Sequence, residues 1–315
     1  MNSKLLSEFA GALTLVFLIP AGLMLASFAP QDNALVVILG SLRLHLCAII
    51  FGLGLVLLLV GRLARALVGF GIVLAVAVHT ALALAPSLTP PAPADARTVT
   101  VMSFNILAEN TQNGDAIADF ILSAGPDIVF VQEARPLRRL LDRLATVYPY
   151  RIGCDAGRSC DSMLLSRHRL AGAEFYMSDT RAARRLYTTS VTIDGQRIAL
   201  AGIHLTKAEY GNSQAAEYRI AAEQIAALTD PVIVAGDFNT APWAPRFIDF
   251  LAATGLGRAL IEPATWPGDS GLLDALGLPI DHILVRGGAI ESLENLPSSF
   301  GSNHRGLIAR IAVPQ

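Results

Sequence analysis

The sequence predicts transmembrane α-helices at the N-terminus, followed by an α/β (α+β) domain built on mixed β-sheets. Residues 1–86 hold three long apolar stretches. They bring the whole chain to 53% hydrophobic and 16% charged residues, against about 25% charged in an average soluble domain. Residues 87–96 form a proline-rich segment typical of an extended linker. In residues 97–315, strand patterns alternate with amphipathic helices and include a hairpin, which favours mixed sheets over a doubly wound parallel sheet.

The apolar stretches predict a membrane anchor of three transmembrane helices, at about residues 9–30, 40–61 and 66–86. A spanning helix needs about 20 apolar residues, and the first and third stretches contain no Asp, Glu, Lys or Arg. Arg43 interrupts the second stretch, and we interpret it as a side chain at a helix end that reaches toward the membrane surface. A cleaved signal peptide is the alternative for the first stretch, but its apolar run exceeds the roughly 7–15 residues of a signal-peptide core.

The basic residues of the anchor predict its orientation. Lys4 precedes the first span, and Arg62 and Arg65 lie at the short second loop, whereas the first loop, residues 29–33, has neither Lys nor Arg. The positive-inside rule then places the N-terminus in the cytoplasm and, after three spans, residues 97–315 outside it. With 22 arginines against two lysines, we interpret the chain as a multi-pass protein of a bacterial inner membrane with a periplasmic domain.

Cysteine spacing agrees with an external domain. Cys154 and Cys160 are six residues apart in a polar, glycine-containing segment, and such a pair can close a disulfide in an oxidising compartment. Two free thiols in a cytoplasmic domain are the alternative. A zinc site is disfavoured because the sequence has no second cysteine pair.

Periodicity and turn residues predict the individual elements of residues 97–315. Strands are expected at residues 99–105, 127–132, 162–166, 186–193, 197–204, 231–235, 280–285 and 305–313, and helices at 115–123, 136–145 and 213–228. The fourth and fifth strands flank Asp194-Gly195, a dipeptide typical of a hairpin turn.

Polar residues recur at the ends of these predicted strands. They are Asn105, Glu133, His204, Asp237 with Asn239, Asp281 with His282, and Asn303 with His304. Carboxylate and amide oxygens suit Mg²⁺, and imidazoles transfer protons. Phosphoryl transfer needs both, because charge builds on the phosphate oxygens while water attacks. Taken singly, an Asp or Asn after a strand usually caps a turn and a lone histidine is usually structural, but the same placement at six strand ends favours one shared site.

The segments that carry these residues form a series of motifs. In chain order they read Ser103-Phe104-Asn105-Ile106, Val131-Gln132-Glu133, Ile203-His204-Leu205, Gly236-Asp237-Phe238-Asn239, Ile280-Asp281-His282-Ile283 and Ser302-Asn303-His304-Arg305. The series resembles the endonuclease/exonuclease/phosphatase superfamily, which includes deoxyribonuclease I, apurinic endonucleases, inositol polyphosphate 5-phosphatases and neutral sphingomyelinases. The resemblance covers residues 97–315. It implies a four-layer sandwich of two packed mixed sheets with helices outside, and hydrolysis of phosphate esters that depends on Mg²⁺, or on Mn²⁺.

The resemblance also implies catalytic roles for five side chains. Asp237 and Asn239 position the attacking water and the phosphate. His304 is the general base or the partner of the transition state, and Asp281 orients it. His204 binds a phosphate oxygen or assists the leaving group. Whether Asp237 or His304 takes the proton of the water is left open.

The metal ligands implied by the resemblance are Glu133, as the principal ligand, with Asn105 beside it. Asn303 departs from the pattern, because the common terminal motif is Ser-Asp-His. An amide oxygen can still bind a hard cation but brings no charge, so we include Asn303 as a metal ligand in a weakened second position. His282 follows Asp281 where aromatic or basic residues are common, and we interpret it as a strand residue that packs near the site.

Together these observations predict a membrane-tethered, metal-dependent phosphodiesterase. A catalytically inactive scaffold or sensor that keeps the fold for binding is the alternative. The substrate stays open among nucleic acids, phospholipid head groups and small phosphate esters. Residues 96–315 carry 20 basic and 23 acidic side chains, a net charge of −3, which disfavours tight binding of duplex nucleic acid. The lipid bilayer is the expected partner of the anchor, and no obligate protein partner is implied.

Overall fold

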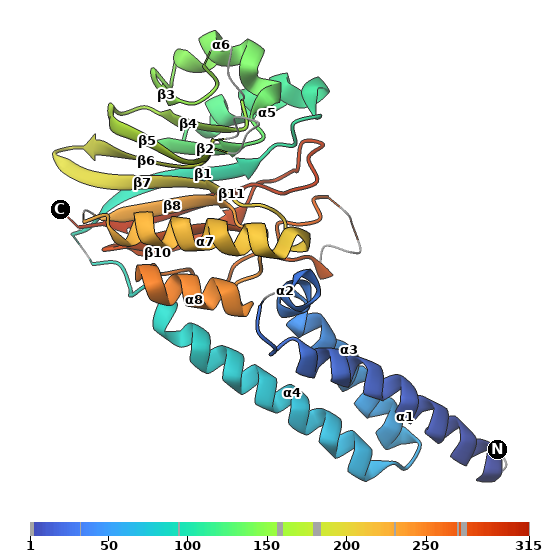
Figure 1. Cartoon of the computed structure of the whole chain (residues 1–315). Helices are drawn as coiled ribbons and strands as arrows, with labels where there is room; N and C mark the ends of the chain where they lie inside the picture. Colours follow the sequence, from blue (N-terminus) through green and yellow to red (C-terminus); the bar gives the residue numbers. More distant parts are fainter. Residues whose placement is uncertain are drawn as a thin grey trace. The chain divides into compact units, whose positions relative to one another are not determined.

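A computed structural model of the chain describes residues 3–31, 33–93, 95–155, 160–178, 184–229, 231–269, 271 and 276–314. The chain divides into two compact units (Figure 1). The first comprises Met1–Pro86 with two short segments, Ala208–Asn212 and Ala241–Ile248, and the second comprises the other residues.

Apolar helices make up the N-terminal part of the first unit. They are α1 (Ser3–Ala26), α2 (Ala34–Ser41), α3 (Arg43–Leu59) and α4 (Leu63–Leu84), followed by a 3-10 turn, η1 (Ala85–Ser87). Two stretches, Glu8–Ala26 and Leu63–Ser87, are helical, long and apolar enough to cross a membrane. The pair α2 and α3 makes a third span only if its two helices, bent by 67°, act as one. The stretch predicted at residues 40–61 is therefore not one straight helix but is broken at Leu42.

Arg43 begins α3 directly after this break. Its guanidinium is buried, donates hydrogen bonds to the carbonyl oxygen (2.7 Å) and hydroxyl (3.0 Å) of Ser27, and lies 4.0 Å from the ring centre of Phe28. A cation at the C-terminal end of a helix satisfies carbonyl groups that have no partner within the helix. Arg43 thus lies at a helix end, as predicted, but it binds the end of α1 within the protein.

Two β-sheets form the second unit. The six-stranded sheet has the order β10-β11-β1-β2-β4-β3, and the five-stranded sheet has the order β5-β6-β7-β8-β9. The strands are β1 (Arg97–Asn105), β2 (Ile128–Gln132), β3 (Tyr150–Ile152), β4 (Ser162–Ser166), β5 (Leu170–Ser178), β6 (Arg184–Ile193), β7 (Gln196–His204), β8 (Val232–Asp237), β9 (Asp281–Arg286), β10 (Ala289–Asn295) and β11 (Leu307–Val313). Each sheet has one parallel pair, β1 with β2 and β7 with β8, and its other pairs are antiparallel. Both sheets are mixed, as predicted.

Successive side chains along a strand pack against different layers of the domain (Figure 1). In β1, Val99 and Val101 join the core between the two sheets, whereas Met102 and Phe104 pack with the helix α5 (Gly114–Ala124) on the other face. Successive strand residues point to opposite faces, so a strand buried on both sides must be apolar throughout. On the far side of the five-stranded sheet, Tyr218 of α7 (Gly211–Ala226) packs against Phe238. The predicted four-layer sandwich is confirmed.

The remaining helical elements are short. They are η2 (Thr111–Asn113), η3 (Arg135–Leu140), α6 (Leu141–Ala145), η4 (Ala208–Tyr210) and α8 (Pro245–Thr254). The predicted helix at residues 136–145 is thus a 3-10 turn followed by one α-helical turn. The strands β3, β5 and β10 and the helix α8 were not predicted. Cys154 and Cys160 are joined in a disulfide, as predicted, with their Cα atoms 4.3 Å apart.

Candidate active site

The predicted polar residues meet because of the strand order. Asn105 and Gln132 pair at the carboxyl ends of the parallel strands β1 and β2, and His204 and Asp237 pair at the ends of β7 and β8. Antiparallel β9 begins at this same edge, with Asp281 opposite Asp237. Ends of parallel strands and beginnings of antiparallel neighbours share one edge of a sheet. The predicted polar residues therefore lie along adjoining edges of the two packed sheets.

Asn105 connects the two sheets. Its amide nitrogen donates to Asp237 Oδ2 (3.0 Å) and to Glu133 Oε1 (3.3 Å), and its amide oxygen accepts from the backbone N–H of Leu107 (3.2 Å). Glu133 directly follows β2 in the left-handed backbone region, at φ 54°, and its Oε2 accepts from the N–H of Ala108 (2.8 Å). The amide therefore bridges two carboxylates in this structure. Its role as a metal ligand remains a prediction.

Asp237 lies at the centre of the site and is fully buried. The preceding residue, Gly236, has φ 149°, and a Cβ atom there would lie 1.8 Å from the carbonyl oxygen of Ile203, so only glycine fits between β8 and β7. Asn239, also left-handed at φ 51°, donates its backbone N–H to Asp237 Oδ1 (2.8 Å) and its side-chain amide to Oδ2 (3.2 Å). Burial, and next the carboxylate of Asp281, raise the pKa of Asp237 above its ordinary value.

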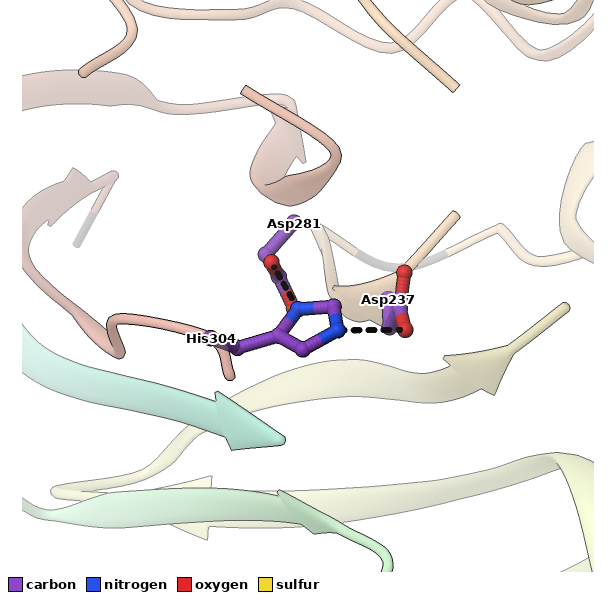
Figure 2. Close-up of side chains that lie close together, drawn as sticks. All are labelled: Asp237, Asp281 and His304. Carbon is purple, nitrogen blue, oxygen red and sulfur yellow. Dashed lines mark hydrogen bonds and ion pairs between the residues drawn. The ribbon is translucent and has the colours of Figure 1, made fainter. Parts of the chain in front are cut away.

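His304 lies between two buried carboxylates (Figure 2). Its Nδ1 is 2.8 Å from Asp281 Oδ2, and its Nε2 is 3.8 Å from Asp237 Oδ2. Burial alone would lower the pKa of His304, but the carboxylates of Asp281, Asp237 and Glu133 outweigh it and raise this pKa to about 9. The hydroxyl of Ser302 fixes the loop, because it donates to the carbonyl of Asn105 (2.7 Å) and accepts from the N–H of His304 (3.1 Å).

His204 also approaches Asp237. Its Nε2 is 3.9 Å from Glu133 Oε1 and 4.0 Å from Asp237 Oδ2, and its Nδ1 is 3.0 Å from Asp161 Oδ2. Burial favours the neutral imidazole, but Asp161 and Asp237 outweigh it and raise the pKa of His204. The same contact lowers the pKa of Asp161 against the opposing effect of its burial.

Asp161 is the site residue that the sequence analysis missed. It precedes β4, which runs antiparallel to β2 with Ser162 opposite Gln132. Asp161 directly precedes the predicted strand at residues 162–166, just as Asp281 stands at the start of β9, so the same criterion applied to this strand would have found it.

His282 is buried and packs beside the site, which confirms its interpretation. Its Nδ1 lies 2.7 Å from Glu262 Oε1, its Nε2 lies 2.9 Å from the carbonyl oxygen of Thr240, and its ring meets the edge of Phe238 at 5.3 Å. Both ring nitrogens are therefore engaged away from Asp237.

Asn303 is not brought into the polar cluster. Its side chain is exposed, and within the described part of the chain it makes no hydrogen bond. Its backbone carbonyl accepts from the N–H of Gly268 (2.7 Å). Its role as a metal ligand stays a prediction.

The donor set fits a hard divalent cation. Asp237, Asp281 and His304 each offer a ligand atom within 4.8 Å of the others, and Glu133 and Asn105 adjoin Asp237. Asp281 Oδ1 is buried without a hydrogen-bond partner. A buried carboxylate oxygen without a partner is costly, and a cation would satisfy it. Oxygen-rich sites of this kind suit Mg²⁺ or Mn²⁺.

Comparisons with known proteins agree with this geometry. The sequence model of the Endonuclease/Exonuclease/phosphatase family matches residues 102–304, a range that contains every site residue described above. A UPF0294 protein of Vibrio cholerae is 32% identical over 118 residues, which are 37% of this chain and 41% of the relative, so the match spans less than half the length of that protein.

Solved structures share the fold at low sequence identity. A humanized TDP2 of D. rerio is 19% identical with a TM-score of 0.56, and the match covers 68% of this chain and 98% of that one. A beta toxin variant from Staphylococcus aureus with bound magnesium ions is 14% identical with a TM-score of 0.53, over 69% of this chain and 100% of that one.

Proposed function

The chain belongs to the endonuclease/exonuclease/phosphatase family, a family of phosphoester hydrolases, and on that premise we propose that it is a membrane-tethered phosphodiesterase that uses Mg²⁺ or Mn²⁺. The observation that carries the proposal is the convergence of two histidine–aspartate pairs on the buried carboxylate of Asp237, with Glu133 beside it. An inactive scaffold would have no need to keep so many buried charged groups together, because burying charge costs stability.

Glu133, with Asn105 beside it, would hold the cation. When bound, the cation supplies positive charge that neutralises the phosphate oxygens and lowers the pKa of bound water. Side chains of the protein orient the catalytic groups around the cation. Asp281 holds the Nδ1–H of His304 and so directs Nε2 toward the reaction centre.

We propose that protonated His304 donates a hydrogen bond to a non-bridging oxygen of the phosphate. The raised pKa of His304 favours the imidazolium at neutral pH. Asp237 then accepts the proton of the attacking water, since its raised pKa makes it a stronger base than an ordinary carboxylate. Asn239 fixes the Asp237 carboxylate through two hydrogen bonds. His204, which also approaches Asp237, assists the leaving group.

The deciding experiment measures turnover by the full-length protein in detergent, with Mg²⁺ and with EDTA. Suitable substrates are bis(p-nitrophenyl) phosphate, p-nitrophenyl phosphate, a single-stranded oligonucleotide and phospholipid vesicles. We expect metal-dependent cleavage of a diester. Glu133→Gln should abolish it because the cation loses a charged ligand, whereas Glu223→Gln, an exposed change on α7, should not. Near-normal activity of Glu133→Gln at millimolar Mg²⁺ would falsify the assignment, and absence of turnover in the wild type would favour the inactive scaffold.

We further propose that the apolar helices anchor the chain in a bacterial inner membrane as a multi-pass protein, with the catalytic domain in the periplasm. The distribution of Lys4, Arg62 and Arg65 and the Cys154–Cys160 disulfide support this orientation. A reporter fused after residue 315 should behave as periplasmic, and native, unreduced protein should resist thiol labelling at both cysteines. Ready labelling of Cys154 and Cys160 in intact cells would argue for a cytoplasmic domain.

A further inference from the structure

One cavity opens beside Glu133, and a second cavity shares part of its lining. The first, about 290 Å³, is lined by Ala108, Glu133, Arg135, Arg138, Cys160 and Asp161. The second, about 500 Å³, is lined by Thr111, Gln112, Arg135, Pro136, Arg138 and Arg139. Because Arg135 and Arg138 line both, the second cavity continues from the catalytic residues past a basic wall.

The first cavity is lined by two acidic and two basic side chains, which suit different charges on a ligand. Glu133 and Asp161 belong to the catalytic cluster described above, where acidic groups attract a cation. Arg135 and Arg138 come from η3, which begins two residues after Glu133. Guanidinium groups bind phosphate oxygens through paired N–H donors. The cavity thus presents a cation-binding side and an anion-binding side to one ligand.

The basic wall is held in a fixed relation to the catalytic residues. The backbone N–H of Ala134, between Glu133 and η3, donates to the carbonyl of Asp161 (3.1 Å). Arg138 donates to the carbonyl of Asp155 (3.1 Å), inside the loop that the Cys154–Cys160 disulfide closes. The wall therefore needs little reorganisation to receive a ligand.

Arg135 and Arg138, which form the wall, and the neighbouring Arg139 differ in what they already bind. Arg139 forms an ion pair with Asp115, which neutralises its charge. The side chain of Arg135 is exposed and, within the residues that the structure describes, makes no hydrogen bond or ion pair. Arg135 is the arginine best suited to bind an external anion.

We propose that these cavities form a subsite for a second phosphate group of the substrate, held by Arg135 and Arg138 while the first phosphate is cleaved. The inference rests on the proposed phosphodiesterase function and narrows its substrate class to compounds with at least two phosphates. That chemistry occurs in bisphosphorylated small molecules and in short single strands of nucleic acid. The net charge of −3 on the second half of the chain fits a local contact with one added phosphate rather than a long basic track.

The test compares two chromogenic substrates that differ by one phosphate: the p-nitrophenyl ester of thymidine 5′-phosphate, with and without a 3′-phosphate. For full-length protein in detergent with Mg²⁺, the 3′-phosphate should raise kcat/KM about tenfold, mainly through KM, as expected for one charge-assisted contact. Arg135→Gln should bring the ratio of the two kcat/KM values close to one. Arg135→Lys, which keeps the charge but loses the paired donors, should give an intermediate ratio.

Arg219→Gln is the matched control, because Arg219 is an exposed arginine on α7 paired with Glu223 and lies outside both cavities. It should keep the wild-type ratio. A ratio near one in a wild type that cleaves both esters would overturn the subsite, as would an unchanged ratio in Arg135→Gln.

A binding measurement separates failure of the subsite from failure of the proposed function. If the wild type cleaves neither ester and none of the diesters named under the proposed function, the phosphodiesterase assignment fails. Calorimetry in EDTA with thymidine 3′,5′-bisphosphate and thymidine 5′-phosphate then tests the subsite alone. An Arg135-dependent preference for the bisphosphate supports the subsite, and equal binding overturns it. Lengthening the ester by one nucleotide distinguishes the sources, because a further gain in kcat/KM indicates a nucleic-acid strand and no gain indicates a small bisphosphate.

Discussion

Two histidine–aspartate pairs flank Asp237, and they have nearly the same geometry. In the first, His304 Nδ1 lies 2.8 Å from Asp281 and Nε2 lies 3.8 Å from Asp237 Oδ2. In the second, His204 Nδ1 lies 3.0 Å from Asp161 and Nε2 lies 4.0 Å from the same oxygen. Each sheet edge thus supplies an imidazole whose second nitrogen is turned toward one central carboxylate.

The two pairs differ in their surroundings. The side chain of Asp281 is 1% exposed, whereas that of Asp161 is 21% exposed and borders a cavity. Arg185 also acts on the second pair, where its charge opposes protonation of His204. Burial therefore isolates the pair of His304 and Asp281 from solvent, and we call it the sealed pair. The pair of His204 and Asp161, which we call the open pair, is closer to exchange with solvent. This difference agrees with the proposed roles, in which His304 contacts a phosphate oxygen and His204 assists the leaving group.

The largest effect that tests this comparison comes from removing each imidazole. His304→Ala should lower kcat by about 10²–10⁴-fold, the range for loss of an acid–base or charge-stabilising group, and His204→Ala should lower it less. Steady-state kinetics on a diester with Mg²⁺ measures both.

His282→Ala serves as the control for loss of a buried imidazole near the site. Its ring is engaged with Glu262 and Thr240, so the change should affect stability more than kcat. A greater loss of kcat in His282→Ala than in His304→Ala would show that the wrong histidine had been assigned.

Neutralising Asp281 or Asp161, the aspartates that contact the two imidazoles, is expected to have a smaller effect than removing an imidazole. In metal-free protein, Asp281→Asn should lower the pKa of His304 from about 9, because the first carboxylate that supports the imidazolium is lost. Asp161→Asn should instead lower the pKa of His204 and leave that of His304 near its wild-type value. Histidine-selective NMR titration in EDTA distinguishes the two, and equal shifts of both imidazoles in either variant would contradict the separation of the pairs.

The raised pKa of His304 also makes the stability of the folded protein depend on pH. The folded-state pKa of His304 is raised above about 6.5, so its contribution is complete below pH 6.5 and disappears as the pH rises through 9. Metal-free wild type should lose about 1–3 kcal/mol across this range, an order-of-magnitude figure from the size of the shift. Asp281→Asn should lose less. Thermal midpoints in EDTA at pH 6 and pH 9.5 provide the measurement, and parallel curves for the two proteins would refute the link.

The sequence predicted one pair completely and the other only in part. Asp281 and His304 lie at the start of β9 and before β11, in motifs whose resemblance to the family implied that Asp281 orients His304. Asp161 precedes β4 and lies in none of these motifs. Its contact with His204 joins the two sheets across 43 positions, as the contact of Asp281 with His304 does across 23 positions. No periodicity encodes which edge of one sheet meets which edge of another, because that depends on how the sheets pack.

In the fold as well, features encoded in the local sequence were predicted, and features that depend on distant contacts were not. The buried strands β2, β4 and β8 are short apolar runs and were predicted within two residues of their ends. The edge strands β3 and β10 carry polar or exposed side chains, so they lack the apolar pattern that marks a strand. The break between α2 and α3 lies directly before Arg43, whose contact with Ser27 the composition of the stretch does not reveal.

The smallest expected effect concerns Asn303, the neighbour of the sealed pair. If its amide is a neutral metal ligand, Asn303→Asp should tighten Mg²⁺ binding. The added carboxylate should also raise the pKa of His304 and move the pH–rate profile upward. The structure favours a weaker outcome, because the Asn303 side chain is exposed and an exposed charge is screened by solvent and salt. We therefore expect a change of less than about threefold in Mg²⁺ affinity, in line with the modest energy of exposed charge pairs.

Metal titration followed by activity, together with pH–rate curves for wild type and Asn303→Asp, separates the two outcomes. Ser302→Ala is a useful companion, because it removes the hydroxyl that ties this loop to Asn105 and His304 without adding charge. If Asn303→Asp tightens Mg²⁺ binding tenfold or more while Ser302→Ala only lowers kcat, position 303 is a ligand site, and its amide weakens one cation position. If Asn303→Asp changes neither the affinity nor the profile, the buried pair of His304 and Asp281 is insulated from charge at the adjacent surface. Its difference from the open pair of His204 and Asp161 then follows from burial and from the charge of Arg185.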